Sequence, residues 1–206
     1  MTKKLKVLGS QAGYDLAAAD YDKKEAYLDS FEKDKLLPLL GDLKNKKVLD
    51  VGAGTGRLAM RLAKLGADVT ALDVSGAMLE EIKKKLKRNS AEIKVIVGDC
   101  ESMPFGDESF DVVVAAFLIV HLKDLRRFFD EVYRILKPGG KFLVTNINQK
   151  RPPEIRTKEG IIEIESYYHR PEKVREILED LAFGIEEEVF VREGEVWVNQ
   201  IILAVK

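Results

Sequence analysis

The stretch VLDVGAGTGRLA, residues 48–59, places three glycines directly after an apolar run. Such glycines let the chain turn sharply and turn backbone N–H groups and a helix N-terminus toward a ligand that resembles a nucleotide. Two spacings compete in this loop. The pattern Gly54-x-Gly56-x-x-Ala59 fits the dinucleotide fingerprint, whereas Gly52-x-Gly54-x-Gly56 fits a different cofactor. The loop alone therefore predicts a nucleoside-bearing cofactor without naming it.

An acidic residue ends the next apolar segment. Asp73 follows the segment 68–72, where a carboxylate at the C-terminal edge of a parallel sheet can accept hydrogen bonds from both hydroxyls of a ribose. Its simpler role would be to cap the following helix, but Ser75 is already a good N-cap, which favours the ribose role. Arg57 stands where a fingerprint that starts at Gly52 would need its next glycine, so the dinucleotide pattern has to start two residues late.

Alternating strands and helices must position these residues. We expect strands at 46–51, 68–74, 91–99, 109–120 and 141–148, and helices at 56–66, 75–89 and 123–140. Strands and helices that alternate at this spacing predict βαβ units and a parallel sheet covered on both faces. The run 112–116 is apolar without alternation, as in a strand buried on both sides, and His121 is expected at the end of the strand 109–120.

The two ends of the chain do not follow this alternation of strands and helices. Residues 30–43 predict a helix with Ser30 as its N-cap and Pro38 as an interruption. The polar segment 149–160 is expected to be a loop or an insertion.

After that segment, a helix is predicted to start near Pro171, a residue well suited to the first helical position. Two strands, 185–193 and 196–206, follow it. Gly194 suits a tight turn between them, so the pair should be antiparallel.

Composition narrows the class of protein. The chain has 206 residues, 46% hydrophobic residues and a net charge of −1, which predicts one folded domain without a global electrostatic pull toward nucleic acid. The basic run 83–88 is interpreted as a solvated helix face. The lone Cys100 excludes an internal disulfide and favours a reducing compartment. With no signal-peptide pattern and no run long enough to cross a membrane, a soluble cytoplasmic protein without a membrane partner is expected.

Four segments in order, VLDVGAGTGRLA, ALDVSGAMLE, VGDCESMPFGDESFDVVVAAFLIVHL and RILKPGGKFLVTN, resemble those of the class I S-adenosylmethionine-dependent methyltransferases. The similarity is greatest to the ubiquinone/menaquinone-biosynthesis type, which acts on small molecules. It implies an α/β Rossmann-like three-layer sandwich with a seven-stranded, mostly parallel sheet whose last strand is antiparallel. The resemblance also implies one methyltransferase domain over 1–206, divided as follows: N-terminal helical cap 1–45, cofactor-binding core 46–148, lid or insertion 149–170, and helix plus C-terminal hairpin 171–206.

The resemblance implies that the cofactor is S-adenosyl-L-methionine, released as S-adenosyl-L-homocysteine. Asp50 would lie near the methionine amino group, Asp73 would hold the ribose, and Asp99 would accept from the adenine amino group. The implied cofactor-binding set is Asp50, Gly52, Ala53, Gly54, Gly56, Asp73, Val74, Met78, Asp99, Cys100 and Phe117, with Leu118 as an alternative to Phe117. Met78 could instead be plain core, and Cys100 is interpreted as pocket wall rather than nucleophile.

Histidines and tyrosines are the candidate residues for binding the methyl acceptor and for removing its proton. A base is needed only if the acceptor loses a proton, and His121 is the candidate catalytic residue. Tyr14, Tyr21, Tyr168 and His169 are the candidate substrate-binding residues, and no metal site is expected. The lid is short, which favours a small-molecule acceptor over nucleic acid. A homodimer is left open.

Two other functions compete with this one. The dinucleotide pattern that starts at Gly54, two residues past the first glycine of the loop, would suit an NAD(P)-dependent oxidoreductase. A non-catalytic methyltransferase-like binding module would show a damaged glycine loop or lack the ribose acid, and Gly52, Gly54, Gly56 and Asp73 are all present.

Overall fold

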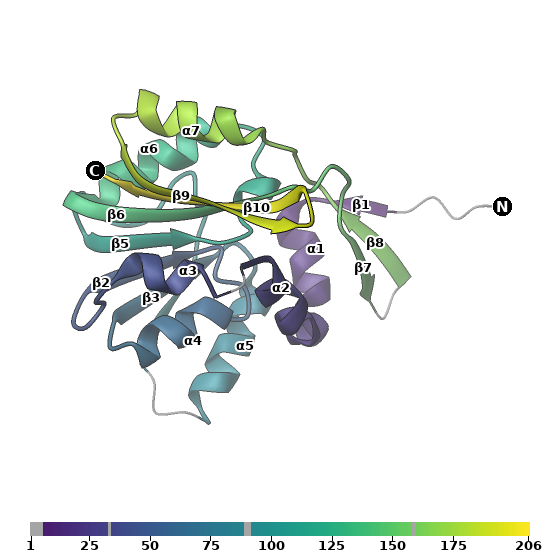
Figure 1. Cartoon of the computed structure of the whole chain (residues 1–206). Coiled ribbons are helices and arrows are strands. Elements are labelled where there is room, and N and C mark those ends of the chain that lie inside the picture. The colour runs from purple at the N-terminus through teal and green to yellow at the C-terminus, as the bar shows by residue number, and fades with distance from the viewer. Residues whose placement is uncertain (1–5, 33, 89–91, 158–159) are drawn as a thin grey trace.

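The computed structural model describes residues 6–32, 34–88, 92–157 and 160–206. The last residue of the expected helix 75–89 and the first of the expected strand 91–99 lie outside the described residues, as do residues 1–5 and 33 of the expected cap and residues 158–159 of the expected loop. Figure 1 shows a central twisted sheet with helices on both faces and a smaller sheet beside one end of it.

The central sheet has seven strands in the order β4-β3-β2-β5-β6-β10-β9. In that order they are β4 (Ile93–Val97), β3 (Asp68–Asp73), β2 (Lys47–Val51), β5 (Phe110–Ala115), β6 (Leu136–Ile147), β10 (Val196–Val205) and β9 (Gly184–Glu193). The first five pair in parallel, and β10 is antiparallel to both of its neighbours. The predicted fold class is confirmed, including the antiparallel last strand.

Helices cover both faces of this sheet (Figure 1). On one face lie α3 (Leu36–Leu40), α4 (Arg57–Lys64) and α5 (Gly76–Leu86), and on the other α6 (Leu125–Ile135) and α7 (Pro171–Asp180). Each face has its own buried cluster; Phe128 and Phe129 of α6 pack against Phe142 of β6 in one of them. The local signals act as predicted: Ser75 Oγ accepts from the Met78 N–H, and Pro171 opens α7.

A second sheet was not predicted. The expected loop at 149–160 contains β7 (Glu154–Thr157), which forms an antiparallel hairpin with β8 (Gly160–Ile164), and β1 (Lys6–Leu8) pairs in parallel with β8. Of the two alternatives, a loop or an insertion, the loop was wrong and the segment forms part of an inserted hairpin. The polar residues around Ile155 obscured its short apolar alternation. Ile155, Ile162 and Ile164 are buried against α1 (Ser10–Ala17), a contact that local sequence does not reveal.

The N-terminal segment folds into α1, the 3₁₀ helix η1 (Ala18–Lys24) and α2 (Glu25–Glu32). The prediction that Ser30 caps a helix was wrong. Ser30 lies inside α2, where its hydroxyl donates to the Tyr27 carbonyl at 2.6 Å. Among the described residues, no helix is both long enough and apolar enough to cross a membrane.

Two element ends near the site also differ from the prediction. Strand β5 ends at Ala115, so His121 lies in the 3₁₀ helix η2 (Ile119–His121) rather than at the end of a strand. Helix α6 ends at Ile135, and β6 begins at once because Leu136 pairs with Phe110 of β5. The turn after β5 is tight at Phe117, whose φ is +58° and whose N–H donates to Thr145 Oγ1 at 2.9 Å.

Candidate functional site

A cavity of about 240 Å³ lies where β2, β3, β4 and β5 end. The carboxyl ends of parallel strands are the usual ligand edge of an open α/β sheet. It is lined by these predicted residues: Tyr14, Tyr21, Asp50, Gly52, Ala53, Gly54, Asp73, Val74, Met78, Asp99, Cys100, Phe117, its alternative Leu118, and His121. Of the predicted cofactor set, only Gly56 does not line the cavity.

The glycine loop is held against β3. The N–H groups of Gly52 and Ala53 both donate to the Leu72 carbonyl, at 2.8 and 3.0 Å. Gly52, Gly54 and Gly56 have φ of +70°, +55° and +86°, a region that residues with a Cβ rarely adopt. A Cβ on Gly56 would also lie 2.8 Å from Ile82 Cγ1. The loop geometry therefore requires all three glycines, and it starts at Gly52.

Asp73 joins the loop to the next helix. Its Oδ2 accepts from the Gly54 N–H and its Oδ1 from the Ser75 N–H, both at 2.8 Å. The side chain is buried, which raises the pKa of Asp73, while the N–H groups of Ser75 and Gly54 act in the opposite direction. Each carboxylate oxygen can accept more than one hydrogen bond, so Asp73 can organise the loop and still bind a ligand hydroxyl.

Asp50 is an incompletely satisfied acid in the cavity wall. The residue is only 2% exposed, and its Oδ2 has no hydrogen-bond partner among the described residues. Burial raises the pKa of Asp50 to about 7, against the lowering effect of the Arg57 guanidinium. A buried acceptor without a donor is costly, so this position fits a cationic ligand group such as an ammonium.

Tyr14 and His121 form a hydrogen-bonded pair. Tyr14 Oη lies 2.7 Å from His121 Nε2, and His121 Nδ1 lies 2.9 Å from the Glu165 carbonyl oxygen. A carbonyl only accepts, so Nδ1 carries the proton and Nε2 accepts from the Tyr14 hydroxyl. Burial lowers the pKa of His121 and raises that of Tyr14 well above its usual value, which keeps both groups neutral near pH 7.

Cys100 lines the cavity wall and is poorly suited to act as a nucleophile. Burial, with Asp99 and Glu101 nearby, raises the pKa of its thiol to about 12. Almost no thiolate then exists at neutral pH, and the thiolate is the reactive form. Asp99 is held in place because its Oδ1 accepts from the Glu101 N–H at 2.9 Å.

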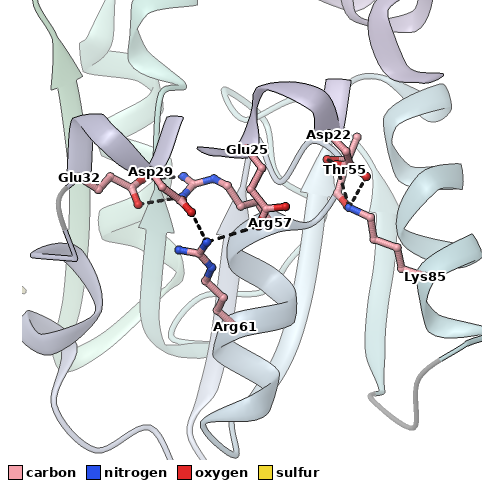
Figure 2. Close-up of polar contacts among 8 residues, drawn as sticks. All are labelled: Asp22, Glu25, Asp29, Glu32, Thr55, Arg57, Arg61 and Lys85. Carbon is pink, nitrogen blue, oxygen red and sulfur yellow. Dashed lines mark hydrogen bonds and ion pairs between the residues drawn. The ribbon is translucent and has the colours of Figure 1, made fainter. Parts of the chain in front are cut away.

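A network of ion pairs fastens η1 and α2 to the glycine loop, and we call it the N-terminal clasp (Figure 2). The Arg57 guanidinium donates to both Glu32 oxygens, at 2.6 and 2.8 Å, and to Asp29 at 2.7 Å. Arg61 pairs with Asp29 and, at 3.4 Å, with Glu25. The clasp holds α2 beside the cavity, which Leu28 of that helix lines.

The clasp has a second part beyond the glycine loop, also drawn in Figure 2. Thr55 Oγ1 donates to Asp22 at 2.6 Å, and Lys85 Nζ donates to the Thr55 carbonyl at 2.8 Å and pairs with Asp22. Sequence reasoning missed the clasp, although a signal was present. The acidic partners recur at 22, 25, 29 and 32, the spacing of one helix face, opposite Arg57 and Arg61 at i and i+4.

The structure does not bring Tyr168 and His169 into the cavity. His169 Nε2 lies 3.0 and 2.9 Å from the carbonyl oxygens of Ile119 and Leu122, an anchoring contact. The Tyr168 ring lies 6.5 Å from the Trp197 ring. Further lining residues that sequence reasoning did not single out as binding residues are Ser10, Gln11, Leu28, Thr55, Arg57, Leu58, Leu72, Gly98, Ala116 and Leu122.

The family model described as "Methyltransferase domain" matches residues 49–144, which span the glycine loop, Asp73, Asp99 and β5 through most of β6. This segment, just under half of the chain, is therefore similar to a methyltransferase domain. The resemblance drawn from the four sequence segments is confirmed at this level.

Curated relatives and solved structures agree with this domain. The chain is 37% identical over 112 residues to the ubiquinone/menaquinone biosynthesis C-methyltransferase UbiE of Geotalea daltonii, covering 52% of this chain and 48% of that protein. It is 33% identical over 145 residues to the malonyl-[acyl-carrier protein] O-methyltransferase of Salmonella typhimurium, covering 70% and 56%. The chain thus spans about half the length of the curated relatives it matches.

The fold extends beyond the matched segment. A crystal structure of a SAM-dependent methyltransferase from Aquifex aeolicus superposes with a TM-score of 0.71 at 23% identity, covering 91% of this chain and 97% of that one. The methyltransferase fold therefore includes β10 and β9, which lie outside the segment matched by the family model.

Proposed function

We propose that this protein is an S-adenosylmethionine-dependent methyltransferase that moves a methyl group to a small molecule. One observation carries the proposal: the Asp50 carboxylate with its unpartnered Oδ2, the glycine loop, Asp73 and Asp99 line a single cavity in a methyltransferase-like domain. The relatives named above methylate different acceptors, so they support the reaction class more strongly than any one acceptor.

The residues present suit each part of the cofactor. Asp50 would hold the ammonium of the methionine part, Asp73 the ribose hydroxyls and Asp99 the adenine amino group. Val74 and the buried Met78 would pack on the adenine. S-Adenosylmethionine supplies a sulfonium-activated methyl group, so the protein has to bind, orient and exclude water.

The Tyr14–His121 pair would serve an acceptor that loses a proton. The lowered pKa of His121 keeps its Nε2 free of a proton near pH 7, and the Tyr14 hydroxyl already donates to that atom. A proton taken up by the Tyr14 oxygen would let the tyrosine's own proton move to Nε2, and the charge would rest on an imidazole anchored to the Glu165 carbonyl.

Calorimetry tests the reaction class. We expect measurable heat on titration with S-adenosylmethionine and with S-adenosylhomocysteine, and none above background with NADH. The same protein sample serves all three titrations, so inactive protein would be visible as the absence of every signal together with a lost thermal transition. Binding of NADH without either sulfur compound would favour the oxidoreductase instead.

Cofactor binding is expected to depend on pH through Asp50. Its pKa of about 7 leaves the carboxyl mostly neutral at pH 6 and mostly ionised at pH 8. Since an ammonium prefers the carboxylate, the affinity for S-adenosylhomocysteine should fall about tenfold from pH 8 to pH 6. Asp50→Asn cannot ionise and should flatten the profile. Equal slopes for both proteins would exclude Asp50 as the ammonium partner.

Several coarser expectations belong to the same proposal. We infer one methyltransferase domain over 1–206, with 1–45 as cap, 46–148 as cofactor-binding core, 149–170 as lid, and 171–206 completing the sheet. A cytoplasmic location is supported by the lone Cys100, and a small-molecule acceptor by the net charge of −1 and the short lid. The oligomeric state, a monomer or a homodimer, is a question for measurement in solution.

A further inference from the structure

The backbone of Glu165 connects both members of the Tyr14–His121 pair. Its N–H donates to the Leu8 carbonyl of β1 at 2.9 Å, and its carbonyl oxygen lies 2.9 Å from His121 Nδ1. Only Gly9 separates Leu8 from helix α1, which carries Tyr14. One residue, directly after β8, therefore holds the chain that leads into the Tyr14 helix and the imidazole of His121.

The residues that follow Glu165 are tied to the 3₁₀ helix η2. The Tyr167 N–H donates to the Val120 carbonyl at 2.7 Å. His169 Nε2 lies 3.0 and 2.9 Å from two carbonyl oxygens within residues 119–122. Residues 165–169 thus run along η2 as a fastened segment, which we call the η2 strap. The strap keeps the Glu165 carbonyl in place against the imidazole.

Helix α1 approaches β8 most closely at Gly13. A Cβ on Gly13 would lie 2.7 Å from Ile164 Cγ1, and Ile164 is fully buried, so the approach requires a glycine. Gly13 precedes Tyr14, and Ile164 precedes Glu165. The packing of α1 on β8 therefore helps to set the 2.7 Å distance between Tyr14 Oη and His121 Nε2.

The tautomer of His121 decides the direction in which the pair can move a proton. With its proton on Nδ1, Nε2 accepts from the Tyr14 hydroxyl, and the Tyr14 oxygen can still accept a hydrogen bond from a third group. With the proton on Nε2, that N–H would donate to the Tyr14 oxygen, and the Tyr14 hydroxyl would have to donate elsewhere. Because both residues line the first cavity, the first tautomer presents a base to a ligand there and the second an acid.

The Glu165 carbonyl distinguishes these two tautomers. An unprotonated Nδ1 would place its lone pair 2.9 Å from a carbonyl oxygen, which also carries only lone pairs. A protonated Nδ1 donates to that oxygen instead. The hydrogen bond of one ring nitrogen commonly sets which nitrogen carries the proton. This contact favours the tautomer in which the pair is a base.

We propose that Glu165 is a positioning residue, and that its backbone carbonyl directs the Tyr14–His121 pair to take a proton from the methyl acceptor rather than to give one. This inference rests on the proposed function, because the proton comes from the acceptor of that reaction. As the acceptor atom bonds to the methyl carbon and the sulfur–methyl bond breaks, the acceptor's proton passes to Tyr14 Oη and the Tyr14 proton to Nε2. The positive charge lost by the sulfonium then rests on the imidazolium, whose Nδ1–H stays on the Glu165 carbonyl.

Nitrogen NMR of histidine labelled with nitrogen-15 tests this assignment. The chain has two histidines, and the structure gives them opposite tautomers. At pH 8, His121 should carry its proton on Nδ1, whereas His169 should carry its proton on the Nε2 that faces two carbonyl oxygens. Protonated and unprotonated ring nitrogens resonate far apart, so the two tautomers are distinguishable. His121→Asn removes one set of signals and assigns the other.

Tyr14→Phe separates the two possible causes of the tautomer. If the Glu165 carbonyl sets it, His121 keeps its proton on Nδ1 without the Tyr14 hydroxyl, and only the Nε2 resonance shifts because it loses a donor. A mixture of tautomers in Tyr14→Phe would mean that Tyr14 selects the proton position, and the positioning role of Glu165 would be overturned.

Gly13→Ala and Gly9→Ala form a matched pair of changes at α1. Gly13→Ala should push the helix away from Ile164 and shift the His121 Nε2 resonance in the same direction as Tyr14→Phe. A Cβ on Gly9 would have no atom within 4 Å, so Gly9→Ala should leave the resonance unchanged. Circular dichroism melts check that both variants fold. Identical spectra for the two would contradict the contribution of the α1–β8 packing.

Calorimetry on the same labelled protein separates this inference from the proposed function. Binding of S-adenosylhomocysteine, with a His121 Nδ1 proton that Tyr14→Phe retains, supports the inference. Binding with the proton on Nε2 instead overturns the positioning role of Glu165 and leaves the proposed function standing. If S-adenosylhomocysteine fails to bind, the proposed function is wrong, and the inference falls with it.

Discussion

Replacing Arg57 by methionine is expected to lower the free energy of unfolding by about 3–5 kcal/mol. The Arg57 and Glu32 side chains are only 11% and 4% exposed, and the guanidinium donates to both carboxylate oxygens (Figure 2). Arg57→Met leaves the Glu32 carboxylate buried without its cation, which is the most expensive way to break such a pair. Urea denaturation followed by circular dichroism measures the change.

Two further variants make this test specific. Arg126→Met breaks a pair with Asp180 whose side chains are 46% and 48% exposed, and should cost less than about 1 kcal/mol. Arg57→Met combined with Glu32→Leu removes the stranded charge and should recover much of the loss. Equal costs for Arg57→Met and Arg126→Met would mean that the N-terminal clasp contributes little to stability.

Asp73→Ala is expected to weaken S-adenosylhomocysteine binding by about 1–3 kcal/mol, or roughly fivefold to 150-fold. The loss has two sources in the structure: the acceptor for the ribose hydroxyls disappears, and the Gly54 and Ser75 N–H groups lose their partner. Calorimetry gives the affinity, and urea denaturation without ligand gives the stability cost separately.

Asp15→Ala is the matched control for this prediction. Asp15 accepts from Ser75 Oγ at 2.6 Å, so it supports the start of the same helix α5 without lining the cavity. It should lower stability with little change in ligand affinity. If Asp15→Ala and Asp73→Ala weaken binding equally, Asp73 acts only by shaping the loop, and the ribose role is excluded.

Much of the fold follows from local patterns. The strand–helix alternation, the Ser75 cap, Pro171 and the Gly194 turn were all readable because each depends on residues near one another in the chain. The hairpin of β7 and β8 was not, because its strands are short and depend on pairing with β1 and on packing against α1. Strand pairing over long sequence distances leaves little local trace.

The sequence by itself indicated the resemblance to methyltransferases, and it predicted the parallel sheet and many of the groups at its ligand edge. Glycines at fixed spacing, and acids directly after strands, have few other uses, and parallel strands bring their carboxyl ends to one place. Only the tertiary structure decided how distant segments meet there. It paired Tyr14 with His121, bound Arg57 to Glu32, kept His169 out of the cavity and placed Phe117 in the cavity wall. These contacts join residues far apart in the chain, and the local pattern around a residue does not say which distant residue it will meet.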